Sequence, residues 1–321
     1  MKKLTGMLLA CTMLVGLMAG CSTTPTATTT TTTTAANDTT AADATTTAAA
    51  DETTAAAAQG LTDDIVVISR EDGSGTRGAF IELMGVEVKD EAGNKSDMTT
   101  PGAVIANKTD VMLTQVAGNK AAIGYVSLGS LNDTVKALSI DGVEATNENV
   151  KNGSYAVARP FNIATKGTPE EGSLTADFIS FILSKEGQEV ISDGYIPVDD
   201  AAPAYAGTKP SGKITVGGSS SVTPIMEKLK EAYVALNPNA TIELQQSDST
   251  AGMTSTIDGA YDIGMASREL KDSEKAELTG TQIAIDGIAV IVNPENPVND
   301  LSQDAVRAIF TGETTNWANV E

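Results

Sequence analysis

The stretch IVVISREDGSGTRGAF, residues 65–80, joins an apolar run to a glycine-rich turn and then to a helical pattern. Ile65 to Ser69 have the composition of a buried β-strand, and Ala79 and Phe80 begin an apolar stripe with helical spacing. A strand, a glycine-rich turn and a helix present free backbone N–H groups and the positive end of the helix dipole to an anion. Taken alone, the stretch is equally compatible with a solvated turn before a capped helix.

The side chains of this turn also suit an anion. Ser74 and Thr76 add hydroxyl donors, and Arg70 can form two parallel hydrogen bonds with a carboxylate or phosphate group. Asp72 follows Arg70 by two residues, and we expect its carboxylate to hold the guanidinium in place.

Two later stretches repeat the same arrangement. In ITVGGSSSVTPIM (214–226) a strand runs into small residues before a helix, and Ser221 is well placed to donate its N–H and its hydroxyl. In LQQSDSTAGMTSTI (244–257) Ser249 lies at a third turn before a helix. Each serine is also explained by helix capping alone, so the argument depends on finding all three turns in one chain.

A fourth stretch, YDIGMASREL (261–270), places Asp262 before an apolar strand-like run. A lone carboxylate in such a position is more often a solvated turn residue than a ligand. If the three turns form one anion site, however, Asp262 can only accept hydrogen bonds. It then favours an anion that still carries a proton, such as hydrogen phosphate, over fully ionised sulfate.

The composition excludes several classes of function. The formal net charge is −21, from 42 acidic and 21 basic residues, so nucleic acid and anionic lipid are repelled at long range. The chain has no histidine, which removes the usual general base and the Ser-His and Cys-His nucleophile pairs. It has two cysteines, Cys11 and Cys21. We therefore predict no enzyme, no metal site, no cofactor and no nucleic-acid partner.

The N-terminus is typical of export. Lys2 and Lys3 precede a short apolar run, and small residues precede Cys21, so residues 1–20 are predicted to be a lipoprotein signal peptide. Cys21 would then become the lipidated first residue; an ordinary signal peptide with an incidental cysteine is the alternative. Cleavage also removes Cys11, so an intramolecular disulfide is excluded. Residues 21–60 are almost entirely Thr and Ala, and we predict a disordered stalk because few large apolar side chains are present to offset the entropy of ordering.

Residues 61–321 have the pattern of an α/β protein. Several predicted strands are apolar on both faces, which indicates sheets covered by helices on both sides. Ser302 is a predicted N-cap. The predicted strands are 65–69, 122–126, 213–218, 241–246 and 287–292, and the predicted helices are 173–183, 223–236 and 302–310, with others beginning near Arg77 and Ala251.

As a set, these motifs resemble the phosphate-binding subunit of bacterial high-affinity phosphate ABC importers. The likeness rests on IVVISREDGSGTRGAF, GGSSSVTPIM, DSTAG, YDIGMASREL, IFTGETTNW and AAIGYVSLG, and it covers nearly all of residues 61–321. It implies a two-lobed type II periplasmic-binding-protein-like fold with the ligand cleft between the lobes. It also implies that the arginine partner is Asp72 and that the phosphate ligands are Arg70, Ser74, Gly75, Thr76, Ser221, Val222, Ser249 and Asp262.

The order of the motifs differs from the order in that family, in which the GGSSSV segment comes first. We therefore predict a circular permutation, with residues 199–213 joining what are normally the two ends. The alternative is an artificial joining of two gene fragments. One predicted lobe comprises residues 61–159 and 288–321 and carries Arg70 and Ser74. The other comprises residues 160–287, with crossings near Arg159–Asn162 and Asp286–Ile288, and it carries Ser221, Ser249 and Asp262.

The resemblance implies a lipid-anchored protein on the outer face of the cell membrane that delivers phosphate to the permease and ATPase of an ABC importer. Lobe closure about a hinge is the expected motion. Three alternatives stay open at this point: a receptor for sulfate, molybdate or arsenate, a surface phosphatase, and an adhesin or phosphate sensor carried on the stalk.

Overall fold

The computed structural model describes residues 61–320. The predicted signal peptide, the lipidation site Cys21 and the predicted stalk lie outside the described residues, so they stay predictions. Within residues 61–320, no helix combines the length and the apolar character that crossing a membrane requires.

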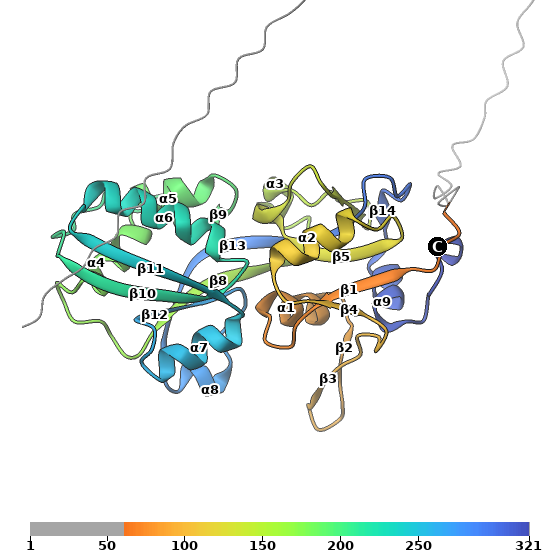
Figure 1. Cartoon of the computed structure of the whole chain (residues 1–321), viewed down its shortest axis with the longest axis horizontal. Coiled ribbons are helices and arrows are strands. Elements are labelled where there is room, and N and C mark those ends of the chain that lie inside the picture. Colours follow the sequence, from red (N-terminus) through yellow and green to blue (C-terminus); the bar gives the residue numbers. More distant parts are fainter. Residues whose placement is uncertain (1–60, 321) are drawn as a thin grey trace, which may run out of the picture. The chain divides into compact units, whose positions relative to one another are not determined.

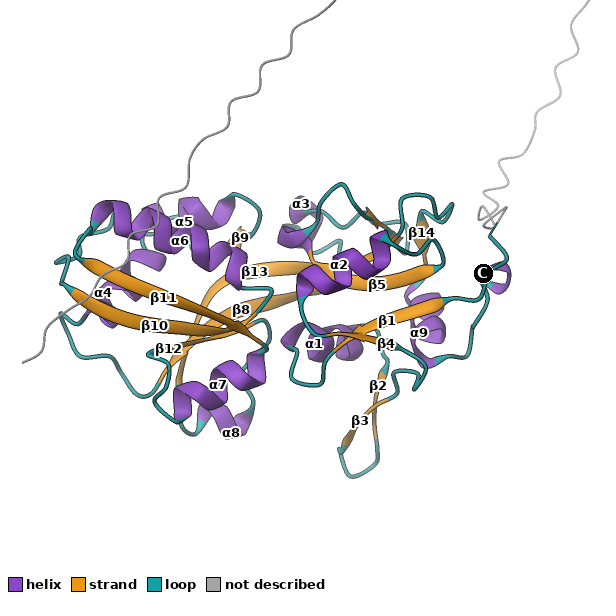
Figure 2. Ribbon diagram, in the orientation of Figure 1, coloured by secondary structure: helices purple, strands orange, loops and turns teal. Residues whose placement is uncertain are grey.

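The described residues form an α/β structure built on a ten-stranded mixed sheet, as predicted for the fold class (Figures 1 and 2). The strand order is β11-β10-β12-β8-β13-β5-β1-β4, and β6 and β9 also pair with β13. These strands are β1 (Val66–Arg70), β4 (Val104–Ala106), β5 (Ala122–Ser127), β6 (Lys136–Ala137), β8 (Ala158–Thr165), β9 (Ile196–Pro197), β10 (Gly212–Ser219), β11 (Ala240–Ser247), β12 (Ile263–Ala266) and β13 (Thr279–Val292). Two small sheets pair β2 (Glu87–Lys89) with β3 (Lys95–Asp97) and β7 (Ser139–Ile140) with β14 (Asp300–Leu301).

Helices cover both faces of the sheet, and most begin at a polar N-cap. Ser74, Ser173, Ser184 and Ser302 each accept a hydrogen bond from the backbone N–H three residues on, so the predicted cap at Ser302 is confirmed. The helices are α1 (Gly75–Leu83), α2 (Thr109–Ala117), α3 (Asn147–Lys151), α4 (Leu174–Ile182), α5 (Lys185–Ser192), α6 (Thr223–Leu236), α7 (Ser249–Ile257), α8 (Asp272–Lys275) and α9 (Gln303–Thr311). The strands and helices expected from the sequence are all present, most with ends shifted by a few residues, but the strand predicted at 287–292 is the second half of the longer β13, which begins at Thr279.

Two hydrophobic cores divide the described residues. The first core packs α1 and α9 on one face of β1 and β5, where Phe80 and Tyr125 stack with ring centroids 3.9 Å apart, and α2 on the other face. The second core packs α4, α5 and α6 on one face of β10 and β11, and Met253 of α7 belongs to a separate small cluster with Ala164 of β8 and Ala266 of β12. Burial on both faces explains why β5 and the second half of β13 are apolar at successive positions, whereas β11 begins with alternating buried and exposed residues.

The strands β8 and β13 run through both cores. β13 pairs with β8 up to Gly287 and with β5 from Ile288 onward, within the range in which the sequence predicts a crossing. At this point Arg159 of β8 donates from Nη2 to Oδ2 of Asp286 at 3.0 Å, and both side chains are buried. The division into two lobes at these residues stays a prediction.

The first and last described segments lie side by side. Ile65 donates its backbone N–H to the Thr315 carbonyl, and Trp317 donates to the Asp63 carbonyl. A chain whose ends are adjacent is one in which a circular permutation is physically tolerable. The permutation itself stays a prediction.

Candidate functional site

Four helix N-termini meet where strands of the two cores end. β1 leads into α1 and β4 into α2 beside the first core, while β10 leads into α6 and β11 into α7 beside the second. β10 and β11 are parallel with Ser219 opposite Ser247, so these two strand ends are adjacent. β1 and β4 are parallel with Arg70 opposite Ala106, which aligns the other two ends. The first N–H groups of each helix have no partner within the helix, so this edge is rich in donors.

Eight hydroxyl side chains gather at these ends, and we call them the hydroxyl cluster. Ser219 Oγ lies 3.0 Å from Ser267 Oγ, and Ser249 Oγ accepts a hydrogen bond from the Ser267 N–H at 3.1 Å. No member is more than 4% exposed. The members are Ser74, Thr76, Thr109, Ser219, Ser220, Ser221, Ser249 and Ser267.

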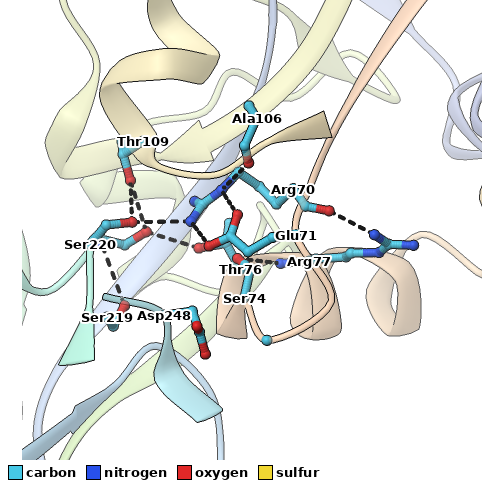
Figure 3. A network of polar contacts seen from close by, with 12 residues as sticks. Arg70, Glu71, Ser74, Thr76, Arg77, Ala106, Thr109, Ser219, Ser220 and Asp248 are labelled. Atoms are coloured by element: carbon cyan, nitrogen blue, oxygen red, sulfur yellow. Dashed lines mark hydrogen bonds and ion pairs between the residues drawn. The ribbon is translucent and has the colours of Figure 1, made fainter. Parts of the chain in front are cut away.

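Hydrogen bonds join the hydroxyl cluster across the two cores (Figure 3). Thr76 Oγ1, beside the first core, lies 2.9 Å from Ser221 Oγ, beside the second. Thr109 Oγ1 lies 3.2 Å from Ser220 Oγ. Arg70 Nη2 donates to the same Ser220 Oγ at 3.0 Å. The predicted residues Arg70, Thr76 and Ser221 are therefore brought together, although as many as 151 positions separate them in the chain.

Arg70 is the buried cation of this site, with a side chain 3% exposed. Its Nε donates to the Ala106 carbonyl at 3.1 Å, and its backbone N–H donates to the Tyr125 hydroxyl at 3.1 Å. Burial raises the pKa of Tyr125 and outweighs the hydrogen bonds that lower it, so this phenol stays protonated. The guanidinium is thus held in one orientation from several sides.

The acid that orients Arg70 is Glu71, and the prediction of Asp72 is wrong. Glu71 accepts two parallel bonds, from Arg70 Nε at 2.8 Å and from Nη2 at 2.7 Å. The Asp72 side chain is 97% exposed and pairs with Arg77 at 2.9 Å. Residue spacing alone did not distinguish the two acids, because both follow the strand closely and the path of the turn decides which one faces inward.

Asp262 is also outside the site, contrary to prediction. Its side chain is exposed, and its Oδ2 accepts a hydrogen bond from the Thr215 N–H at 2.7 Å. Thr215 precedes Ser219 by four residues, about 13 Å along the strand. Because β12 runs parallel to β10, the C-terminal end of β12 faces the site and its N-terminal end does not. Ser267, just beyond β12, therefore takes the place predicted for Asp262.

The structure gives Val222 no free donor to the hydroxyl cluster. Its backbone N–H donates to the Ser219 carbonyl at 3.0 Å, and its side chain is buried in the second core. The Val222 N–H is therefore bonded within its own turn.

Two glycines allow the elements of the two cores to approach closely. A Cβ built on Gly75 would lie 2.5 Å from Ser249 Oγ and 2.8 Å from Ser267 Oγ, and one built on Gly73 would overlap the Asp248 carboxylate. Thr250 donates from its N–H and from its hydroxyl to the Gly73 carbonyl, each at 3.2 Å. Glycine is thus required at these two positions by packing against the second core.

Sequence reasoning missed five side chains that the structure places at this site. Thr109 had a usable signal, because it begins a helix directly after a short strand that lies parallel to β1. Ser219 and Ser220 lie next to the predicted residue Ser221, so they could have been included. Ser267 and Glu71 could be found only once the direction of β12 and the path of the turn after β1 were known. Among residues 61–320 no group of three or more acidic, cysteine or histidine residues is arranged to hold a metal ion.

The fold and the site together define an α/β protein that can surround a small anion with hydroxyl groups, helix N-termini and one arginine. Such a site stabilises a desolvated anion by direct hydrogen bonds, since each anion oxygen must be bonded when water is removed. Comparison with known proteins agrees with this class. The sequence matches the model of the PBP superfamily domain over residues 51–186 and 203–321.

The chain belongs to the family of PstS phosphate-binding proteins. It is 55% identical to phosphate-binding protein PstS 2 of Streptococcus agalactiae serotype V over 258 residues, which cover 80% of this chain and 87% of that protein. It is 46% identical over 264 residues to phosphate-binding protein PstS 2 of Streptococcus pneumoniae serotype 4, covering 82% and 90% of the two chains. The crystal structure of a phosphate ABC transporter phosphate-binding protein from Streptococcus pneumoniae TIGR4 matches with a TM-score of 0.64 at 46% identity, covering 81% of this chain and all of that one.

Proposed function

We propose that this protein captures inorganic phosphate outside the cytoplasm and delivers it to the permease of an ABC-type phosphate importer, whose ATPase drives uptake. The observation that carries the proposal is the hydroxyl cluster, in which buried hydroxyls from both cores surround Arg70. The relatives named above are phosphate-binding proteins, and one solved relative is described as part of a phosphate ABC transporter.

The ligands we propose are the members of the hydroxyl cluster, together with Arg70 and the backbone N–H groups at the start of α1, including that of Gly75. Four helix N-termini and one guanidinium supply many donors without a mobile counter-ion. A globally acidic protein can bind an anion in this way because the donors are local and buried, whereas the net charge of −21 acts from the surface.

Isothermal titration calorimetry of the purified protein with phosphate tests the proposal. We expect tight 1:1 binding that is lost when Arg70 is replaced by Met, while the matched variant Arg307→Met, in α9, binds normally. Arg307 lies outside the hydroxyl cluster and is 38% exposed. Absence of phosphate binding by the wild-type protein would reject the proposal.

The same experiment separates the alternatives. Preferential binding of arsenate, molybdate or sulfate would make the protein a receptor for a different tetrahedral oxyanion. Hydrolysis of a chromogenic phosphate ester would revive the phosphatase reading, which we reject because the chain has no histidine and its relatives are binding proteins. Binding to a matrix or host protein in the absence of phosphate binding would favour an adhesin.

We also propose that the protein is anchored by lipid at Cys21 on the outer face of the membrane. The support is the signal-like N-terminus with small residues before this cysteine. Metabolic labelling with palmitate should be lost in Cys21→Ala and retained in the control Cys11→Ala. Equal labelling of both variants would contradict the assignment.

A further inference from the structure

Thr250, the second residue of α7, bonds the turn before α1 from the other core. Its backbone N–H and its hydroxyl both donate to the Gly73 carbonyl, each at 3.2 Å. Figure 1 shows α7 next to this turn. The same turn continues into Ser74, the N-cap of α1, and Gly75, the first residue of α1. Thr250 therefore fastens a helix of the second core to the turn that places the N-terminus of α1.

The donors of Thr250 end on protein and not on an anion. A threonine has one hydroxyl proton and one backbone N–H, and Gly73 accepts from both. Neither donor is left for a ligand. Thr250 can therefore influence a bound anion only through the position of the turn.

Arg268 fixes the direction of the Thr250 hydroxyl. Its Nη2 donates to Thr250 Oγ1 at 3.2 Å. Because the hydroxyl oxygen accepts this bond, its proton points away from Arg268 and toward the Gly73 carbonyl. A charged donor also polarises the hydroxyl and strengthens the bond that the hydroxyl donates.

Glu274 holds Arg268 in the required orientation. The two side chains form two parallel bonds, from Nη1 to Oε2 at 2.7 Å and from Nη2 to Oε1 at 2.8 Å, and they are 11% and 7% exposed. Burial raises the pKa of Glu274, but the hydrogen bonds from Arg268 and the Lys271 N–H lower it by more, so this carboxylate stays ionised. We call Thr250, Arg268 and Glu274 the latch. All three belong to the segment 160–287, so the latch is ordered before the two cores meet.

A bond between the two cores opposes their separation. An anion enclosed by hydroxyls from both cores can leave only when the cores move apart, which breaks the bonds from Thr250 to Gly73. Entry takes place while the cores are apart, before these bonds form. The latch therefore acts on the release of the anion and not on its capture.

We propose that Thr250, oriented by Arg268 and Glu274, is a positioning residue that holds the two cores together around bound phosphate and so sets the rate of phosphate release. The proposal rests on the phosphate-binding function proposed above. It adds to that function a residue that controls how long phosphate stays bound without contacting it.

Release of radiolabelled phosphate into an excess of unlabelled phosphate tests the latch in Thr250→Val. Valine has the shape of threonine and keeps the backbone bond to Gly73, but it lacks the hydroxyl. We expect release to be faster by about fivefold, the effect of losing one neutral hydrogen bond. The association rate constant, obtained from the release rate and the calorimetric Kd, should stay within about twofold of the wild-type value.

Two variants serve as controls. Thr250→Ser keeps the hydroxyl and should release phosphate within about twofold of the wild-type rate. Thr254→Val makes the same chemical change one turn later in α7, at an exposed position, and should release phosphate at the wild-type rate.

The kinetic readout separates the latch from a general effect on the fold. Release from Thr250→Val at the wild-type rate overturns the proposal, and so does a loss of affinity that comes entirely from slower association. Thr250→Ser that releases phosphate as fast as Thr250→Val also overturns it. Wild-type protein that binds no phosphate rejects the proposed function, and the latch with it. Circular dichroism verifies folding, and if Thr250→Val does not fold, Thr250→Ala removes the same hydroxyl and is judged by the same two rates.

Discussion

Gly75 offers the most direct test of how the two cores meet. It is the first residue of α1, and it faces Ser249 and Ser267 from the other core. In Gly75→Ala the new Cβ would lie 2.5 Å from Ser249 Oγ, far inside ordinary contact. Ser249 Oγ cannot rotate away without losing its bond from the Ser267 N–H, so we expect the two sides to separate.

The size of the effect follows from the bonds that cross the same gap. Restoring ordinary contact requires a separation of roughly 1 Å. The bond between the Thr76 and Ser221 hydroxyls at 2.9 Å and the bond that Arg70 donates to Ser220 at 3.0 Å would then exceed hydrogen-bonding distance. A neutral bond contributes about 0.5–1.5 kcal/mol and a charged one about 1.5–3 kcal/mol. The loss of about 2–4 kcal/mol corresponds to phosphate binding weaker by a factor of about 30 to 1,000.

Calorimetry with phosphate measures this loss, and Gly78→Ala is the control. Gly78 lies in the same helix, and a Cβ added there would meet no atom within 4 Å. That variant should bind phosphate normally, and its free energy of unfolding should rise by about 0.5–1 kcal/mol because alanine favours the helix. If Gly75→Ala binds phosphate as tightly as wild type, the arrangement of Figure 3 is not the one that holds the ligand.

Three further predictions concern acidic residues. Asp262→Asn should leave phosphate affinity and sulfate rejection unchanged in calorimetry, because Asp262 is exposed and bonds the Thr215 N–H; a change above about tenfold would return it to the site. Asp286→Ala should lower the free energy of unfolding, measured in urea, by about 3–5 kcal/mol, because it leaves the Arg159 guanidinium buried and unpaired. The double variant Arg159→Met with Asp286→Leu should recover most of this loss. Burial raises the pKa of Asp177, but the hydrogen bonds that its carboxylate accepts, first among them the one from Tyr205, lower the pKa by more. The pKa of Asp177 therefore lies below 3.8. Its stabilisation is therefore present above that pH and lost as the pH falls through the lowered pKa, and the expected cost of Asp177→Asn, about 1–2 kcal/mol in urea at pH 7, should shrink at pH 3.

Much of the architecture depends on residues that are close in the sequence, so it could be predicted from the sequence. Apolar runs bounded by glycine and serine indicated the strands, and Ser302 indicated the start of α9, because strand burial and helix capping depend on neighbouring residues. The three turns that carry Arg70, Ser221 and Ser249 were predicted for the same reason. Whether they bind phosphate stays a prediction that the titrations above address.

The errors concern direction and distance instead. The sequence predicts Asp262 as a ligand, yet the parallel pairing of β10 and β12 turns Ser267 toward the hydroxyl cluster. The sequence predicts Asp72 as the partner of Arg70, but the turn exposes Asp72 and folds Glu71 onto Arg70. Residue types and spacing indicate that donors and acceptors are present, but not which end of a strand faces a partner.

The donor groups are therefore encoded locally, whereas their assembly into one cluster depends on the fold. Turn sequences alone specify helix N-termini, hydroxyl groups and an arginine, since each depends on residues a few positions apart. These donor groups meet at one edge of the sheet because of the strand order, and because Gly73 and Gly75 permit the two cores to approach closely. That order also leaves Asp262 in solvent, because the parallel pairing of β10 and β12 directs the other end of β12 toward the hydroxyl cluster.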